Sequence, residues 1–140
     1  MARVLVPLAP GCEELEAVTI IDLLRRAQIE VVTAGLADGP VKASRGTVLL
    51  PDTTLDIAAQ QEYDMIVLPG GQPGANNLAQ DTRVIALLKK MAAAGKYTAA
   101  ICAAPKVLAL AGLLDGKRAV SYPGASAVDC GVSIEIDQRQ

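Results

Sequence analysis

A cysteine at a predicted strand-to-helix turn is the residue best suited to nucleophilic chemistry. The apolar run 98–101 leads directly into Cys102, and Pro105 stands where the first turn of a helix would begin; that position tolerates a missing N–H. The arrangement has the geometry of a nucleophile elbow, with small residues in place of the usual glycines. The start of a helix would lower the pKa of the thiol and raise its reactivity. A small buried cysteine is the competing interpretation.

A glycine pair after another predicted strand offers a second part of such a site. Gly70 and Gly71 follow the apolar run 65–68. The backbone N–H groups of Gly71 and Ala103 would together form an oxyanion hole beside Cys102. A simple tight turn is the alternative interpretation of the pair.

The sequence contains no histidine, so a carboxylate would have to move protons. This absence excludes Ser-His-Asp and Cys-His nucleophiles and zinc sites built on histidine. Glu13, Glu14 and Glu16 stand at the start of the first predicted helix. A carboxyl held beside a thiolate in a closed pocket has a raised pKa and can donate a hydrogen bond to the sulfur. The alternative is that all three are surface acids favoured by the helix dipole.

The composition predicts one folded domain over residues 1–140. The chain is 51% hydrophobic and 20% charged, with a net charge of −2 and only three aromatic residues, all Tyr. We therefore expect a substantial core and no nucleic-acid partner. The three cysteines form neither a disulfide framework nor a CxxC site, and no apolar stretch is long enough to span a bilayer. These features favour a cytoplasmic protein without a membrane partner.

Strands and helices alternate along the chain, which favours an α/β fold with a mainly parallel sheet. Apolar runs predict strands at 4–8, 29–34, 65–68, 98–102, 119–122 and 132–136, and a small hairpin at 41–50. Helical spacing predicts helices at 13–28, from 84 to a cap at Gly95, and at 105–114. In the first helix, one side is expected to hold Leu15, Val18, Ile21, Leu24 and Ala27. Ligands of such sheets bind beyond the carboxyl ends of the strands, where the cysteine, glycine and glutamate loops would meet.

Three segments together resemble the ThiJ/PfpI superfamily. They are 9–18, which contains the glutamates, 67–75, which contains the glycine pair, and 99–105 around Cys102. The run Ser44-Arg45-Gly46 agrees with the same pattern, and the resemblance extends from residue 2 to about residue 123. Within the superfamily, the chain is most similar to the branch of the parkinsonism-associated deglycase and its bacterial chaperone-like relatives.

The resemblance implies a flavodoxin-like three-layer αβα sandwich and a homodimer. It also implies a reactive Cys102, a protonated Glu16 bonded to it, and N–H groups of Gly71 and Ala103 that face the sulfur. No metal and no cofactor are expected. We further expect four neighbours of this site, namely Gly70, Glu13, Arg45 and Tyr122.

Two departures from the family pattern stand out. The family often places a His before a Pro near the cysteine, whereas this chain has Tyr122 before Pro123. A tyrosine can form hydrogen bonds but does not titrate near neutral pH. The family's last strand–loop–helix segment has no counterpart in these 140 residues, so we expect the domain to be incomplete at its C-terminus.

Members of the branch are described as cofactor-independent glyoxalases, protein deglycases and oxidative-stress chaperones. The leading hypothesis is therefore an enzyme that acts through Cys102 on a small aldehyde or dicarbonyl. The second is a redox sensor and holdase chaperone that binds unfolded client proteins through the same oxidisable cysteine. An inert flavodoxin-like module that binds a protein partner is a third interpretation.

Overall fold

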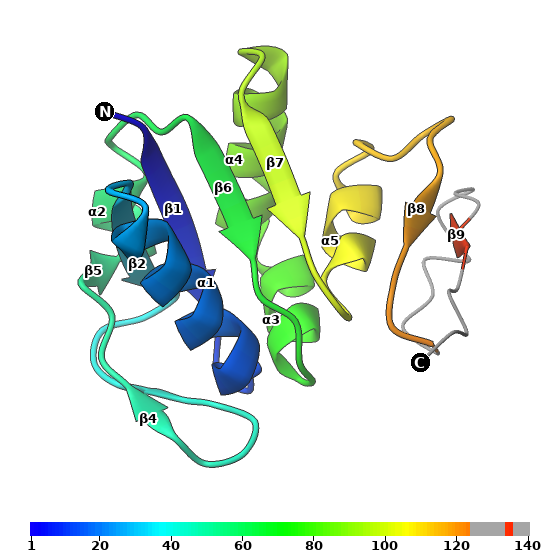
Figure 1. The fold of residues 1–140 in the computed structure, drawn as a ribbon. Coiled ribbons are helices and arrows are strands. Elements are labelled where there is room, and N and C mark those ends of the chain that lie inside the picture. The colour runs from blue at the N-terminus through cyan, green and yellow to red at the C-terminus, as the bar shows by residue number, and fades with distance from the viewer. Residues whose placement is uncertain (124–133, 136–140) are drawn as a thin grey trace.

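The computed structural model describes residues 1–123 and 134–135, and its centre is a five-stranded parallel sheet (Figure 1). The strand order is β5-β2-β1-β6-β7. The strands are β1 (Arg3–Leu8), β2 (Glu30–Gly35), β5 (Thr53–Thr54), β6 (Met65–Leu68) and β7 (Tyr97–Ala100). Every neighbouring pair is parallel, so all the carboxyl ends meet at one edge of the sheet.

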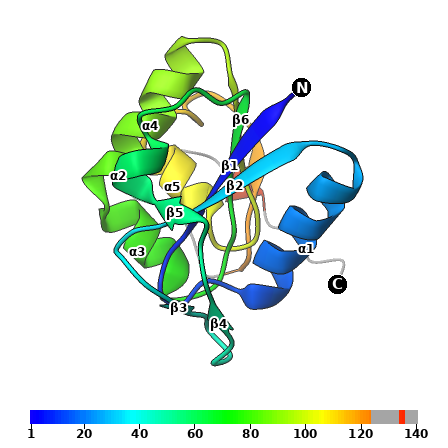
Figure 2. The same cartoon turned by 90° about the vertical axis from the view of Figure 1, so that its left-hand side faces the viewer.

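Helices cover both faces of this sheet. They are α1 (Glu14–Arg26), α2 (Leu55–Ala58), α3 (Gly74–Gln80), α4 (Thr82–Ala93) and α5 (Pro105–Leu110). Among the described elements, α1 is the one helix on its face of the sheet, and the other helices gather on the opposite face (Figure 2). The predicted three-layer αβα sandwich with a mainly parallel sheet is confirmed.

The core alternates along the central strand β1. Val4, Val6 and Leu8 belong to the cluster beneath α1, whereas Leu5 and Ala9 belong to the larger cluster beneath the other helices. Each of these side chains is buried. A strand buried on both faces is a near-continuous apolar run, which is the pattern that predicted it.

Helix α1 contacts the sheet along a narrower stripe than predicted. Ala17 is fully buried, and Ile21 and Leu24 pack against the same cluster. The prediction is wrong for Ala27, which is exposed just beyond the end of the helix, and for Leu15 and Val18, which are 73% and 47% exposed. At 3.6 residues per turn, positions 17, 21 and 24 share a face, and positions 15 and 18 lie outside it.

The remaining elements differ from the predictions in several places. The hairpin is confirmed as β3 (Val41–Lys42) paired antiparallel with β4 (Val48–Leu49), and we call residues 41–49 the arm. Strand β8 (Ala119–Val120) pairs with β9 (Ile134–Glu135) outside the central sheet. The rest of the predicted strand 132–136 lies outside the described residues. The predicted helix 105–114 ends at Leu110, and Gly112 adopts a left-handed conformation just beyond it.

In the described part of the chain, no helix has the length and hydrophobicity needed to cross a membrane.

Candidate active site

Three loops meet at the carboxyl edge of the sheet. The loop after β1 reaches the loop after β6 through two hydrogen bonds: the Glu13 N–H donates to Gly70 O at 2.9 Å, and the Gly74 N–H donates to Gly11 O at 3.1 Å. The loop after β7 joins them where the Ile101 N–H donates to Leu68 O at 3.2 Å. The predicted meeting of these loops is confirmed.

Cys102 sits in a strained turn between β7 and α5. Its φ of 60° lies in the left-handed region, which a residue with a side chain seldom adopts. Its carbonyl oxygen accepts a hydrogen bond from the Tyr122 N–H at 2.8 Å, and its side chain is half-buried. The turn holds the sulfur at the edge of the sheet, as a nucleophile elbow does.

Gly70 and Gly71 are glycines because the loops approach one another too closely for a side chain. A Cβ on Gly70 would lie 2.6 Å from the Cys102 Cβ and 2.7 Å from Glu16 Oε1. A Cβ on Gly71 would lie 2.5 Å from the Glu13 nitrogen. Gly71 also has a φ of +90°, which favours glycine. The glycine pair therefore allows both the cysteine and the glutamate to touch the loop backbone.

Glu16 reaches the same point from the first turn of α1. Its Oε1 accepts a hydrogen bond from the Gly70 N–H at 2.9 Å, and the side chain also forms a hydrogen bond with Cys102. Of the three glutamates, Glu16 is therefore the one that faces the cysteine.

The groups around the Cys102 sulfur shift the pKa of its thiol in opposite directions. Burial and the Glu16 carboxylate raise the pKa of the thiol, whereas hydrogen bonds from the N–H groups of Gly71 and Ala103 lower it, and the net direction is upward. The sequence-based expectation of a lowered thiol pKa is therefore wrong in direction. The reason is that desolvation and a facing carboxylate outweigh the two N–H groups.

Glu13 and Glu14 have other tasks at the start of α1. Glu13 caps the helix, because its side chain accepts a hydrogen bond from the Leu15 N–H at 3.2 Å. Glu14 holds the arm: its carboxylate accepts hydrogen bonds from the N–H groups of Arg45 and Thr47 and from the Ser44 hydroxyl. Burial opposes these donors, but together with the N–H of Glu14 itself they lower the pKa of Glu14 to about 2.

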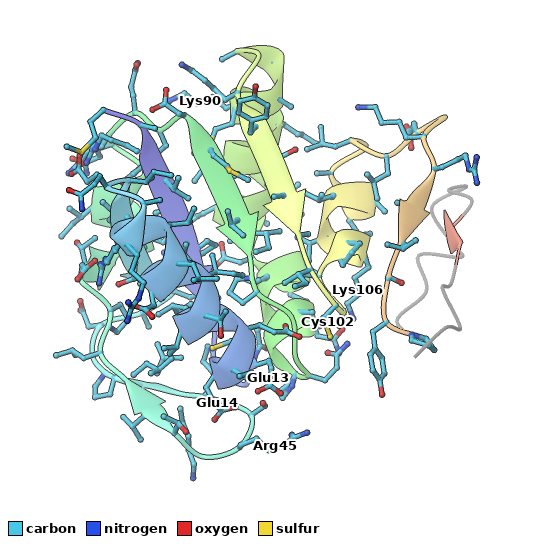
Figure 3. The ribbon with its side chains drawn as sticks, in the orientation of Figure 1. Glu13, Glu14, Arg45, Lys90, Cys102 and Lys106 are labelled. Carbon is cyan, nitrogen blue, oxygen red and sulfur yellow. The ribbon has the colours of Figure 1, made fainter. Side chains whose placement is uncertain are left out.

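Arg45 and Tyr122 contribute backbone groups to this region, and their side chains are exposed. Figure 3 places Arg45 on the arm, near Glu14 and on the far side of Glu13 from Cys102. In the described part of the chain, the Arg45 guanidinium and the Tyr122 hydroxyl have no hydrogen-bond partner. Cys12 is a buried residue of the loop after β1, and Cys130 lies outside the described residues.

The sequence-based reasoning missed Lys106, which lies near Cys102, and its partner Asn76. Lys106 in the first turn of α5 donates a hydrogen bond from Nζ to Asn76 Oδ1 in the first turn of α3. Figure 3 shows Lys106 next to Cys102 at the start of α5. The available signal was a lysine directly after a proline at a helix start, where the helix dipole disfavours a cation.

A metal site needs several ligating side chains in one place. Among the residues that the structure describes, no group of three His, Cys, Asp or Glu side chains gathers closely enough to hold a metal ion.

Known proteins are similar to this chain in sequence and in fold. The profile of the DJ-1/PfpI family matches residues 2–134. Protein dj-1beta of Drosophila melanogaster is 48% identical over 120 residues, which are 85% of this chain and 64% of the relative. The glutathione-independent glyoxalase DJR-1.2 of Caenorhabditis elegans is 35% identical over 121 residues, 86% of this chain and 64% of the relative. The chain thus spans a little under two thirds of these relatives.

A solved structure shows the same arrangement of elements. Oxidized DJ-1 of Toxoplasma gondii superposes with a TM-score of 0.86 at 43% identity, over 95% of this chain and 75% of the other. The resemblance found in the three sequence segments is confirmed by this fold and by the family profile. The chain belongs to the DJ-1/PfpI family.

Proposed function

We propose that the protein is a cofactor-independent enzyme of the glyoxalase and protein deglycase type, acting on small dicarbonyls or glycated groups. One observation carries the proposal: the strained Cys102 directs its sulfur at the Glu16 carboxyl and at the N–H groups of Gly71 and Ala103. A relative in the same family is named a glutathione-independent glyoxalase, which supports this reaction class.

The reaction begins with one proton shared by Cys102 and Glu16. Burial and the facing Glu16 side chain raise the pKa of the Cys102 thiol. With the proton on Glu16, the sulfur is a thiolate and adds to the aldehyde carbon of a 2-oxoaldehyde. The new oxyanion accepts hydrogen bonds from the Gly71 and Ala103 N–H groups, and Glu16 protonates it to give a hemithioacetal.

The next step moves a proton between the two carbons of the substrate. The Glu16 carboxylate removes the proton from the former aldehyde carbon and returns one to the neighbouring carbon, so that the ketone is reduced as the aldehyde carbon is oxidised to a thioester. Water then hydrolyses the thioester, which releases the 2-hydroxy acid and restores the thiol. Methylglyoxal and water together yield lactate, without an external oxidant or reductant.

The test is lactate formation from methylglyoxal by the wild type, Cys102→Ser and Glu16→Ala. We expect both variants to lose turnover while remaining folded by circular dichroism. Equal rates in all three proteins would contradict the proposal.

A second candidate function uses the same sulfur as a redox sensor coupled to holdase activity toward unfolded client proteins. It is favoured by the half-exposed Cys102 and by the oxidized form of the Toxoplasma gondii relative. Two equivalents of peroxide would convert the thiolate to a sulfinate with release of two waters. Intact mass after graded peroxide tests this; a Cys102 without selective two-oxygen addition would contradict it.

We also propose that the chain forms a homodimer through the outer side of α1. This surface carries exposed apolar side chains, Leu15 and Val18 with Leu23 at 59% exposure, which are costly to leave in water as a group. Sedimentation equilibrium of the wild type and Leu15→Glu tests it. A wild type that sediments as a monomer would contradict the proposal.

A further inference from the structure

A cation lies near Cys102, where the first turns of two helices meet. Ala75 of α3 and Ala103 pack together with Cys102, and the hydrogen bond from Lys106 to Asn76 crosses between the same two helices. Lys106 is therefore tied down close to Cys102, as Figure 3 shows.

The Lys106 charge has no compensating anion in the described part of the chain. Among the described residues its hydrogen-bond partner is the neutral amide of Asn76, and no carboxylate forms an ion pair with it. Partial burial lowers the pKa of the ammonium group. The first turn of a helix is also an unfavourable place for a cation. A half-buried, uncompensated lysine at this place costs stability, and a bound anion beside it would offset that cost.

We propose that Lys106, positioned by Asn76, selects substrates that carry an anionic group beyond the reacting carbonyls. This inference rests on the proposed function and names its substrate class: 2-oxoaldehydes with a remote carboxylate. In such a substrate the aldehyde carbon meets the Cys102 sulfur, and the carboxylate meets the Lys106 ammonium at the rim. The chemistry is unchanged: the oxoaldehyde and water give the corresponding 2-hydroxy acid, and Lys106 neither gains nor loses a proton.

The first test measures the charge preference of Cys102 without using turnover. Iodoacetate is an anion and iodoacetamide is neutral, and both alkylate the same sulfur. The rate with iodoacetate divided by the rate with iodoacetamide, read at Cys102 by peptide mass spectrometry, therefore reports the local electrostatic potential. We expect Lys106→Ala to lower this ratio roughly fivefold relative to the wild type. Added sodium chloride should reduce the ratio in the wild type more than in the variant.

Matched variants separate charge from structure. Lys106→Arg keeps the cation and should keep the ratio. Asn76→Asp places a carboxylate against Lys106 and should lower the ratio about as far as Lys106→Ala does. Lys90→Ala removes a lysine from α4 at the opposite end of the molecule (Figure 3) and should leave the ratio unchanged. A ratio that is the same in Lys106→Ala as in the wild type would overturn the proposal.

The second test uses turnover of 4,5-dioxopentanoate and its neutral methyl ester. We expect Lys106→Ala to raise KM for the acid relative to the ester roughly fivefold, with similar effects on kcat for both. Equal changes in KM for acid and ester would overturn the selectivity. If neither compound is turned over by the wild type, the proposed reaction fails, and the alkylation ratio still decides for or against Lys106.

Discussion

Cys12 and Cys102 follow two strands of the same parallel sheet at the same edge, yet their surroundings differ. Cys12 follows β1 and is completely buried; burial and the negative charges of Glu14 and Glu13 raise the pKa of its thiol to about 11. Cys102 follows β7, is half-buried, and has two backbone N–H groups that favour its thiolate. Position at the end of a strand is therefore insufficient for reactivity, because solvent access and facing N–H groups distinguish the two.

The largest difference is expected in catalysis. Cys102→Ala should reduce lactate formation from methylglyoxal by at least about 100-fold, because the proposed nucleophile is removed. Cys12→Ala should change it by less than about threefold, because the Cys12 thiol stays protonated in the core. Initial rates measure both. A comparable loss in the two variants would break the contrast.

Packing around Cys102 gives the next effect. Gly70→Ala places a methyl group 2.6 Å from the Cys102 Cβ and 2.9 Å from Ile101 O, and we expect it to lower the free energy of unfolding by about 2–3 kcal/mol. In Gly39→Ala the added Cβ has no atom within 4 Å, and the strain comes only from the φ of +90°. We expect this substitution to lower the free energy of unfolding by about 1 kcal/mol. Urea midpoints measure both, and equal midpoints would show that the loop yields freely.

Alkaline pH should act through Cys12. Its thiol pKa rises from 9.0 to about 11 in the folded chain, so folding retains a proton that the unfolded chain releases. The stabilisation from this retained proton is complete below pH 9 and is lost as the pH rises through 11, by about 3 kcal/mol. The difference in unfolding free energy between wild type and Cys12→Ala should shrink over this range. A constant difference would contradict the assignment.

The smallest expected effect is a shift in the pH dependence of Cys102 alkylation. Glu16→Gln removes a carboxylate that raises the Cys102 pKa, so the midpoint for iodoacetamide should move to lower pH even though turnover is lost. Cys12 offers the control, because its alkylation in the folded protein should stay slow in both. A midpoint that moves to higher pH would show that Glu16 stabilises the thiolate instead.

The sequence was sufficient to predict most of the fold. Apolar runs located β1 and β6 because a strand buried on both faces leaves a continuous signal. Helix α3 was missed, because its seven residues carry no helical apolar period. Strand β8 was predicted, but its separation from the central sheet was not, since a short apolar run does not name its partner. Leu15 and Val18 were predicted on the buried side of α1. The sequence offers more than one apolar stripe on this helix and does not show which of them contacts the sheet.

The candidate site was predicted in its backbone more fully than in its electrostatics. The turn around Cys102 and the glycine loop could be predicted because their glycines and proline are residue types that indicate particular backbone geometries. The thiol pKa depends on distances between loops far apart in the chain, as between Glu16 and Cys102, and local pattern does not contain them. Lys106 was missed for the same reason, because its partner Asn76 lies thirty residues away.

The hydrogen bonds between Glu14 and the arm connect two parts of the molecule. The arm is bound to α1 through Glu14, and two residues further along the same helix Glu16 is bound to the loop that carries the glycine pair. Because the pKa of Glu14 is about 2, its hydrogen bonds to the arm keep their full stabilising effect above pH 4.5 and weaken only as the pH falls toward 2. The arm and the glycine loop are therefore anchored two residues apart on one helix, and the Glu14 carboxylate keeps the arm attached to the helix that carries Glu16 throughout the pH range above 4.5.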